Sequence, residues 1–310
     1  MKPRKIKEFK GALGMLREFP SEQACRDFFE QIRWNGKIEC PHCKITGRVA
    51  KFKDGRLYFC GACRKQFTVK VGTIFEDSAL SLQKWFYAVY MLTAHKKGIS
   101  SVQLSKDIGV TQKTAWFMCH RIRFALANNK EKMLDGIVEV DETYIGGEER
   151  NKHLDKQSKV GGGVGGKAPV FGMLDRDDGI VITKPIQRAN ARTLKGMMKS
   201  YIHASSTIMS DEASPYRKTL LHFDGHDTVD HGRKEYVRGD VHTNTLDGFW
   251  SLLKRGIIGI YHKVSVDHLH RYCTEFSYRY NSRKMNDRER FEKAMSNFKG
   301  RLMYKNLITE

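Results

Sequence analysis

Residues Ile137–Gly147, IVEVDETYIGG, predict the strand around which the fold is organised. Side chains alternate along a strand, so Val138 and Val140 face one side of the sheet. Glu139 and Asp141 face the other side. A carboxylate on an apolar strand costs free energy unless it is neutralised, and a bound cation is one way to neutralise it. The stretch therefore predicts a central strand that presents an acid for cation binding.

Two more acids stand in similar contexts. Asp211 follows a strand predicted at Thr207–Ser210, and Asp247 lies near the start of an amphipathic helix predicted at Leu246–Lys254. The apolar residues Leu246, Trp250, Leu253 and Ile257 are expected to pack inward from this helix. Strands and a helix that each supply one carboxylate are typical of enzymes that use two divalent cations to transfer phosphoryl groups. We therefore expect two Mg²⁺ or Mn²⁺ ions to be held by three carboxylates: Asp141, Asp211 and Asp247.

Other roles for these acids stay open. The chain contains 35 acidic residues, so some fall near strands by chance, and an aspartate near a helix start can be a plain cap. Three further acids compete for the same role: Glu142, Glu212 and Asp240. Lys254 lies two turns after Asp247 on the same helix face, where a lysine can hold a substrate phosphate. We therefore count Lys254 among the catalytic candidates.

The charge of the chain predicts a polyanionic partner. The 310 residues carry a net charge of +20, and the pI is about 9.6. Nucleic acid is the expected partner of such a protein. A membrane is not expected, because no stretch approaches the roughly 18 apolar residues of a spanning helix and no secretory signal follows the basic start. Four of the seven cysteines form two CxxC pairs, which favours a metal site in a reducing cytoplasm over disulfides.

The two CxxC pairs predict a zinc ribbon over residues 39–75. A hairpin with a turn at Asp54-Gly55 lies between them, and Arg64–Val71 alternates like a third strand. Tetrahedral Zn²⁺ takes four thiolates, and each CxxC lets two of them reach one ion. We expect one structural Zn²⁺ on four ligands: Cys40, Cys43, Cys60 and Cys63. The ribbon's many lysines and arginines favour DNA contact, with a solvated basic face as the alternative.

Residues 1–38 predict a short helical lead-in that Ser21 caps and Trp34-Asn35-Gly36 ends. Residues 76–130 predict a helix-turn-helix-like region. In the latter, Ser100 caps a short helix, Gly109 turns the chain, and Thr111 caps a longer helix. The front of the longer helix is where base edges are read in this motif, so three residues become candidate DNA contacts: Gln112, Lys113 and Thr114. Many helix pairs pack this way for structure alone, and that alternative stays open.

Residues 135–275 predict a ribonuclease-H-like α/β core. The strand at 137–147 is followed by strands at 170–174 and 180–186, and these three are expected to pair antiparallel. A helix at 191–203, the strand before Asp211 and further helices complete the order of that fold.

The segments around the core have weaker patterns. The basic, glycine-rich stretch after Gly147 resembles no phosphate-binding loop, because no GK[ST] follows; we expect an insertion that touches DNA through its lysines: Lys152, Lys156, Lys159 and Lys167. Residues 276–310 predict a basic helical tail that binds DNA or a second subunit, with a solvated helix face as the alternative. Four histidines lack a metal-ligand spacing and are expected at the surface or at a phosphate: His222, His226, His231 and His242.

Together these motifs resemble the DDE transposases of bacterial insertion sequences that carry an N-terminal zinc ribbon, the ISXO-like group. The resemblance is carried by stretches along most of the chain: CPHC, GTIFEDSALSLQKWF, VDETYIGG, SDEASPY and VHTNTLDGFWSLLKRGIIGIYHKVS. It implies that Asp141, Asp211 and Asp247 are the catalytic acids. It also implies that the surrounding DNA contacts include the following residues: His242, Asn244, Lys254 and Arg255.

The chain departs from the family pattern at the third acid. The family usually has Glu there, whereas Asp247 is one methylene shorter. The resemblance implies metal-dependent cleavage at the ends of a transposon, strand transfer into double-stranded target DNA, and a homo-oligomer that pairs two ends. Two alternatives remain: an inactive or domesticated transposase that acts as a zinc-dependent DNA-binding protein, and a structure-specific nuclease.

Overall fold

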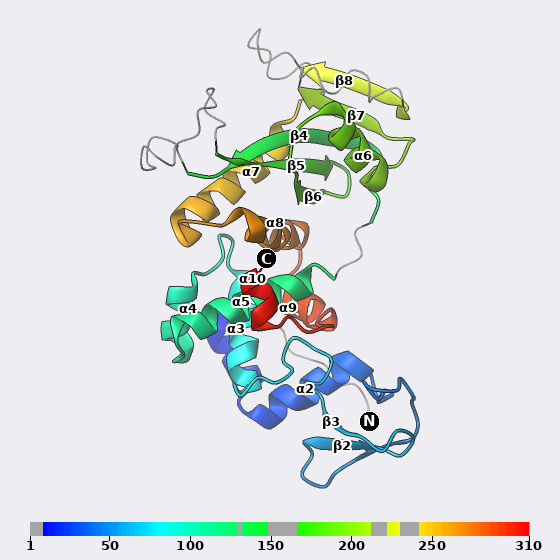
Figure 1. Ribbon diagram of the computed structural model, residues 1–310, viewed down its shortest axis with the longest axis vertical. Helices are drawn as coiled ribbons and strands as arrows, with labels where there is room; N and C mark the ends of the chain where they lie inside the picture. The colour runs from blue at the N-terminus through cyan, green and yellow to red at the C-terminus, as the bar shows by residue number, and fades with distance from the viewer. Residues whose placement is uncertain (1–8, 129–131, 148–165, 212–221, 230–241, 310) are drawn as a thin grey trace. The chain divides into compact units, whose positions relative to one another are not determined.

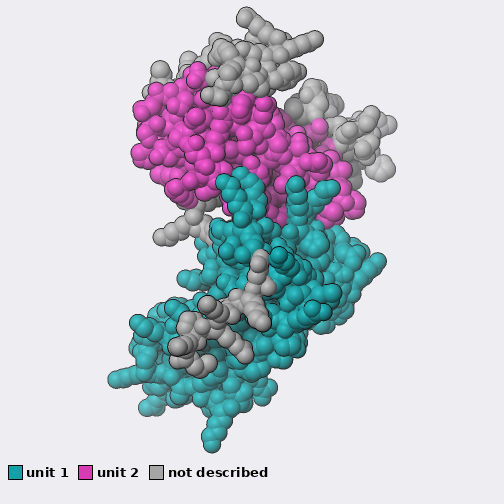
Figure 2. All heavy atoms as spheres, turned by 180° about the vertical axis from the view of Figure 1, so that it is seen from behind, with its two compact units in different colours: residues 1–129, 282–310 teal, residues 130–281 magenta. Residues whose placement is uncertain are grey.

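The computed structural model describes the following residues (Figure 1): 9–128, 132–147, 166–211, 222–229 and 242–309. The chain divides into two compact units (Figure 2). The first contains residues 1–129 and 282–310, and the second contains residues 130–281. Within the described ranges, no helix is both long and apolar enough to cross a lipid bilayer.

The first unit begins with α1 (Gly11–Glu18) and α2 (Glu22–Trp34). The Ser21 hydroxyl caps α2 by accepting the Ala24 N–H at 3.1 Å, as the sequence predicted. Asn35 ends the helix in the left-handed conformation, at φ 44°. The helical lead-in therefore exists, and the break after Trp34 has the expected cause.

A three-stranded antiparallel sheet follows, in the order β1 (Val49–Lys51), β2 (Leu57–Cys60), β3 (Gln66–Thr68). The turn between β1 and β2 holds Gly55 at φ 67°. The side chain of Asp54 accepts the Arg56 N–H there at 3.0 Å. The predicted ribbon is confirmed, with strands shorter than the alternating pattern indicated.

The helix-turn-helix outline is also confirmed. After α3 (Leu82–Ala94), Ser100 caps α4 (Ser101–Ile108) and Thr111 caps α5 (Gln112–Leu126). Gly109 lies between the two helices at φ 61°, a conformation that a glycine adopts without a steric penalty. Ala115, Met118 and Ile122 bury one side of α5.

The C-terminal residues belong to the first unit. We expected residues 276–310 to be a separate tail, but α8 (Val266–Asn281) belongs to the second unit up to its end. Residues 282–310 then add α9 (Asp287–Ser296) and α10 (Tyr304–Thr309) to the first unit. The physical reason is Phe291 of α9, whose ring is fully buried in a cluster of four other phenylalanines: Phe9, Phe19, Phe28 and Phe86.

The second unit is built on a five-stranded sheet of order β6-β5-β4-β7-β8. Its strands have these bounds: β4 Ile137–Ile145, β5 Ala168–Asp175, β6 Ile180–Pro185, β7 Thr207–Asp211 and β8 Gly225–Val229. β4, β5 and β6 pair antiparallel, whereas β7 and β8 run parallel to β4. This is the ribonuclease-H-like topology that the sequence predicted.

Helices cover both faces of this sheet. On one face, α6 (Ala191–Tyr201) packs Leu194 and Met198 against Val138 and Val140 of β4 (Figure 1). On the other face, α7 (Asn244–Gly256) and α8 (Val266–Asn281) form a second core around β5. A π-helical turn, η5 (Ile257–Tyr261), extends α7. The alternation predicted for β4 is therefore correct, and Glu139 and Asp141 face the α7 side.

Several expectations concern residues outside the described ranges. These are the competing acids Glu212 and Asp240, the histidine His231, a short helix at 215–221, and the insertion lysines Lys152, Lys156 and Lys159.

Candidate functional site

Asp141 and Asp211 come together through strand register. β4 and β7 are parallel neighbours in which Ile137 pairs with Thr207 and Glu139 with Met209. The same register continued by two residues sets Asp211, the last residue of β7, beside Asp141. Residues in register on parallel strands face the same side of a sheet. The two carboxylates that the sequence separates by a long stretch therefore share one face of the sheet.

Asp247 approaches the same face from α7. It lies in the first turn of this helix, and its side chain is exposed. The buried side of α7, with Leu246, Trp250 and Leu253, packs on the sheet as expected. The helix thus brings the third acid to the edge where β4 and β7 present theirs.

Electrostatics supports this grouping. Burial raises the pKa of the Asp141 carboxyl from its ordinary value to about 6, and the negative charges of Asp211 and Asp247 contribute to the rise. The three carboxylates are therefore close enough to repel one another. Oxygen donors that repel one another in a partly buried site are the type of ligand set that a hard divalent cation neutralises.

The carboxylates are not as close as a preformed metal cluster. Among the residues that the structure describes, one set of three or more potential ligands has all donor atoms within 4.8 Å of one another, and it is the cysteine set. Asp247 contributes from an exposed helix turn, with a side chain one methylene shorter than the Glu of the family pattern. The three carboxylates together supply donor atoms that suit Mg²⁺ or Mn²⁺, because both ions prefer carboxylate oxygen.

A buried polar network holds α7 against β4. Glu139 is fully buried, and its carboxylate accepts the Leu246 N–H at 2.8 Å and the Arg176 Nε–H at 2.6 Å. Arg176 also bonds to the ring and the carbonyl oxygen of His242. Leu246 is in the first turn of α7, so Glu139 caps this helix from another element. The network fixes the helix end that carries Asp247.

Sequence reasoning missed this network. It noted that Glu139 shares the strand face of Asp141, and an acid at a buried strand position could have indicated a buried ionic partner. Arg176, in the turn between β5 and β6, carries no such signal. His242 was expected at DNA; its ring is 26% exposed and bonds to Arg176 through Nδ1 at 2.9 Å. A DNA contact through its other nitrogen stays a prediction.

Trp250 was predicted to pack inward, and it also makes a polar contact. Its indole N–H donates to Asp141 Oδ2 at 2.8 Å. The exposed face of the same helix carries the remaining candidates, Asn244, Lys254 and Arg255. Their positions are compatible with phosphate contact beside Asp247, which stays a prediction.

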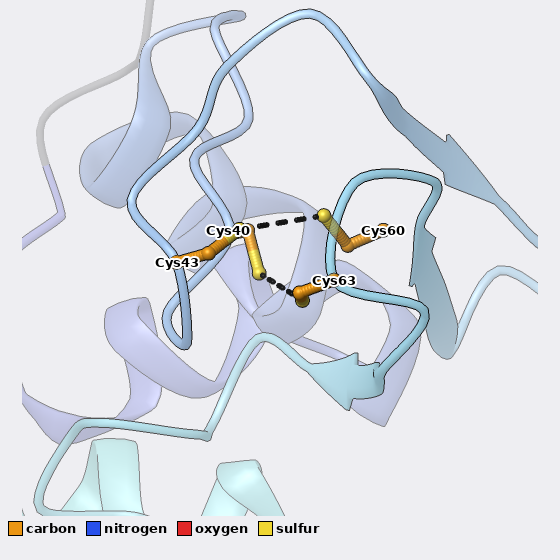
Figure 3. A group of neighbouring side chains, drawn as sticks. All are labelled: Cys40, Cys43, Cys60 and Cys63. Atoms are coloured by element: carbon orange, nitrogen blue, oxygen red, sulfur yellow. Dashed lines mark hydrogen bonds between the residues drawn. The ribbon is translucent and has the colours of Figure 1, made fainter.

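The four cysteines form the second site (Figure 3). The Sγ atoms of Cys40 and Cys63 are 3.7 Å apart, and those of Cys43 and Cys60 are 3.6 Å apart. A tetrahedral ion with bonds of about 2.3 Å to sulfur sets its ligands about 3.8 Å apart, so the cluster fits Zn²⁺.

The two knuckles have the same backbone. Each second cysteine is followed by a left-handed residue, Lys44 at φ 62° and Arg64 at φ 56°. The N–H of that residue donates to the carbonyl of the first cysteine, at 2.9 Å to Cys40 and 2.8 Å to Cys60. N–H groups of Cys63 and Ala62 lower the pKa of the Cys60 thiol to about 7. These hydrogen bonds favour the thiolate form of Cys60, whereas burial and hydrogen bonds to the other three cysteines raise the pKa of the Cys43 thiol.

Some basic residues of the ribbon are already paired within the protein, and others are exposed to solvent. Lys51 pairs with Glu30 at 2.7 Å, and Lys70 is half-buried with its Nζ donating to the Ser78 carbonyl. These two were expected to belong to a basic coat and instead stabilise the unit. Other basic residues of the ribbon are exposed: Arg48, Lys53 and Lys65.

The front of α5 is exposed at two of its three candidate positions. Gln112 and Lys113 are exposed and Thr114 is half-buried. Gln112 bonds to the Ser101 hydroxyl at 2.9 Å, and the Lys113 ammonium lies 4.9 Å from the ring centre of Tyr304 in α10. DNA reading by these residues stays a prediction.

His226 and His222 differ in burial. His222 is exposed, as expected. His226 lies in β8, half-buried, with Nε2 3.0 Å from the Ser210 hydroxyl, and burial lowers its pKa below the ordinary value. It is therefore a half-buried residue of the sheet, where a surface or phosphate-contacting position was expected.

Two protein-family models match the chain, one within each of its two compact units. A model described as the ISXO2-like transposase domain matches residues 133–281, and a model described as the transposase zinc-ribbon domain matches residues 20–66. The fold and the two sites therefore define the class of protein as a transposase with a zinc ribbon.

A full-length comparison narrows the class. The chain is 32% identical over 276 residues to a protein described as uncharacterized, from the transposable element ISH50 of Halobacterium salinarum; the match covers 85% of this chain and 92% of that protein. The chain belongs to the ISXO2-like transposase family.

Two solved structures have a weaker likeness to this chain. The HTLV-2 integrase catalytic core domain in complex with magnesium is 12% identical at a TM-score of 0.28, covering 47% of this chain and 86% of that one. The intasome of simian T-cell lymphotropic virus in complex with PP2A regulatory subunit B56 gamma is 14% identical at 0.27, covering 60% of each chain. At such scores the fold assignment rests on the strand order itself.

Proposed function

We propose that this chain cleaves DNA at the ends of its transposable element and joins those ends to target DNA. The observation that carries the proposal is the parallel register of β4 and β7, which sets Asp141 and Asp211 side by side on the face that α7 approaches with Asp247. The family and the charge of +20 support double-stranded DNA as the substrate.

The three carboxylates would hold two Mg²⁺ or Mn²⁺ ions. When bound, such ions activate an attacking oxygen and stabilise the leaving one in phosphoryl transfer. In the first reaction water attacks the phosphodiester at the element's end, the bond from phosphorus to the 3′-oxygen breaks, and that oxygen takes a proton. In the second, the freed 3′-hydroxyl attacks a target phosphodiester and displaces the target's 3′-oxygen, so one such bond forms for each one broken.

The remaining residues would bind and orient DNA. Lys254 and Arg255 lie on the exposed face of α7 and would contact phosphates beside Asp247, with Asn244 and His242 nearby. The ribbon and the front of α5, through Gln112, Lys113 and Thr114, would recognise the end sequence. A homo-oligomer that pairs two ends, acting in the cytoplasm on the element's own DNA, completes the proposal.

The test is a product assay on duplexes that carry the inverted repeats flanking the gene. The parent protein, Asp141→Asn and Asp227→Asn are incubated with a labelled end and a plasmid target in Mg²⁺ or Mn²⁺. We expect cut and joined products from the parent and from Asp227→Asn, whose exposed aspartate lies in β8, and neither product from Asp141→Asn.

The outcomes separate the alternatives. Cut products that are never joined would favour a structure-specific nuclease. Specific binding of the ends without any product, in both metals, would favour an inactive transposase that acts as a zinc-dependent DNA-binding protein.

A further inference from the structure

The contact between Trp250 and Asp141 links two elements of the proposed site. The indole N–H of Trp250, on α7, donates to Oδ2 of Asp141, on β4, at 2.8 Å. Trp250 is 3% exposed and Asp141 is half-buried, so the bond is partly buried. A hydrogen bond to a charged oxygen in such surroundings is among the stronger ones in proteins.

The sheet leaves room for this ring at one position. Gly172 of β5 is the register partner of Asp141. A Cβ atom on Gly172 would lie 2.4 Å from Cζ2 and 2.7 Å from Cη2 of Trp250, and 3.1 Å from Cδ1 of Leu246. Any side chain at position 172 would therefore displace the ring. Gly172 has no side chain, and the indole of Trp250 occupies the space beside Asp141 that a side chain would fill.

A buried indole needs an acceptor, so the bond has an ordinary structural explanation. The identity of the acceptor indicates a role beyond packing, because Asp141 is the carboxylate proposed to bind the cation. The Glu142 backbone N–H also interacts with this carboxylate. A directed bond at one oxygen restrains the plane of a carboxylate and leaves the other oxygen able to face a second partner. Metal-binding carboxylates are commonly oriented in this way by a donor that does not touch the ion.

The same helix also carries the third acid. Asp247 and Trp250 are three residues apart on α7, so they are neighbours on the helix surface. The Trp250 bond thus ties the position of Asp141 to the helix turn from which Asp247 extends. Loss of the bond would loosen one acid relative to the other without removing either.

We propose that Trp250 is a positioning residue of the catalytic centre: its N–H fixes Oδ2 of Asp141 so that Oδ1 is presented to the cation, and Gly172 provides the space for the ring. This inference rests on the proposed function, because it takes Asp141 as a metal ligand. Trp250 itself touches neither DNA nor the ion.

The test measures cation binding by the intact protein, independently of activity. Mn²⁺ is titrated and the free ion is followed by EPR for the parent, Trp250→Phe and Trp85→Phe. Trp85 is a matched control: it is 1% exposed, lies in the first unit, and donates its indole N–H to the Ser78 hydroxyl at 2.9 Å. We expect Trp250→Phe to bind Mn²⁺ roughly tenfold more weakly, the usual loss when a supporting partner of a metal ligand is removed. Trp85→Phe should bind as the parent does.

A second pair of variants covers the case in which Trp250→Phe does not fold. Replacing Trp250 with benzothienylalanine keeps the size of the ring and removes the N–H donor. Gly172→Ala keeps the donor and displaces the ring. Both should weaken Mn²⁺ binding while the circular dichroism spectrum and the zinc content match those of the parent.

Asp141→Asn separates failure of the inference from failure of the proposed function. If Asp141→Asn loses the Mn²⁺ site and the Trp250 variants bind as the parent does, the bond is structural only and the inference is wrong. If Asp141→Asn also binds as the parent does, the cation is not at Asp141, and the proposed function fails together with the inference.

Discussion

The two candidate metal sites are assembled in different ways. The cysteine set comes from two short turns of the same backbone shape, and its sulfur atoms already lie 3.6 and 3.7 Å apart in pairs. The acidic set comes from β4, β7 and α7, and its oxygens do not all lie within 4.8 Å of one another. The first site is therefore formed by local structure, and the second requires the whole second unit.

The chemistry of the donors explains this difference. Neutral thiols can approach one another before a metal binds, and the ribbon's local hydrogen bonds hold them there. Carboxylates are charged at neutral pH, and burial together with the charges of Asp211 and Asp247 raises the pKa of Asp141. We therefore expect Zn²⁺ to be required for folding of the ribbon. At the three aspartates, we expect the divalent cation to bind to a second unit that is already folded. Four experiments test this contrast.

Loss of zinc should have the largest effect. Cys60→Ser removes one of the four thiolates, and because small zinc modules depend on the metal for their folding, residues 39–75 should become sensitive to limited proteolysis. Elemental analysis should fall from one zinc per chain to none. Cys25→Ala is the control, since Cys25 is buried in α2 apart from the cluster. A ribbon that resists proteolysis without zinc would remove the distinction between the two sites.

Glu139→Ala should destabilise the second unit by about 3–5 kcal/mol, because it leaves the partly buried Arg176 without its carboxylate partner and the start of α7 without its cap. Thermal denaturation of the intact protein measures the loss. Glu139→Gln keeps an acceptor for the Leu246 N–H and should lose less. Hydrogen exchange localises the effect: amides in the first turn of α7 should exchange faster, and those of the ribbon should not.

Asp247→Glu should strengthen Mn²⁺ binding by about tenfold, which corresponds to about 1.4 kcal/mol. The longer side chain reaches one methylene further from the exposed first turn of α7 toward the other two acids. Asp267→Glu is the matched control, because Asp267 is an exposed aspartate in the first turn of α8. Unchanged or weaker binding by Asp247→Glu would mean that the distance of the third acid does not limit the site.

The smallest effect concerns pH. The folded-state pKa of Asp141 is raised to about 6 from 3.8, so the folded protein holds this proton more tightly than the unfolded chain. The stability from this group is fully present below about pH 4 and is lost as the pH rises through 6. Without metal, Asp141→Asn should therefore be more stable than the parent at pH 7.5, by on the order of 1 kcal/mol or about 2–4 °C in melting temperature.

Added Mg²⁺ should reverse that order, because it stabilises a parent that binds it and not the variant. Melting curves at pH 4.5 and 7.5, with and without Mg²⁺, give the comparison. A parent that is the more stable of the two at pH 7.5 without metal would show that the Asp141 carboxylate is already compensated within the protein.

The sequence predicted the features that depend on local pattern. The alternation of Val138 and Val140 gave the correct face of β4, and side-chain oxygens at Ser21, Ser100 and Thr111 gave the starts of three helices. The spacing of the cysteines gave the ribbon. Each of these features depends on short-range spacing: the alternation along one strand, a cap beside its own helix, or two cysteines within one CxxC turn.

Features that depend on distant partners could not be read in this way. Arg176 pairs with Glu139 and Trp250 with Asp141 because the fold brings β4, β5 and α7 together, and nothing near Arg176 in the chain indicates its partner. Gly172 reads as an ordinary strand glycine until the ring that covers it is known. Phe291 likewise reads as part of a basic helix, although its ring closes the core of the first unit.

The position of Phe291 has a consequence for how the protein is made. Synthesis on the ribosome completes the ribbon, α3 to α5 and all of the second unit before the residue that fills the phenylalanine cluster emerges. The core of the N-terminal part therefore stays open until Phe291 has been synthesised. A frameshift shortly before Phe291 would damage the segment that was synthesised first, because α9 completes the folding of α1 to α3.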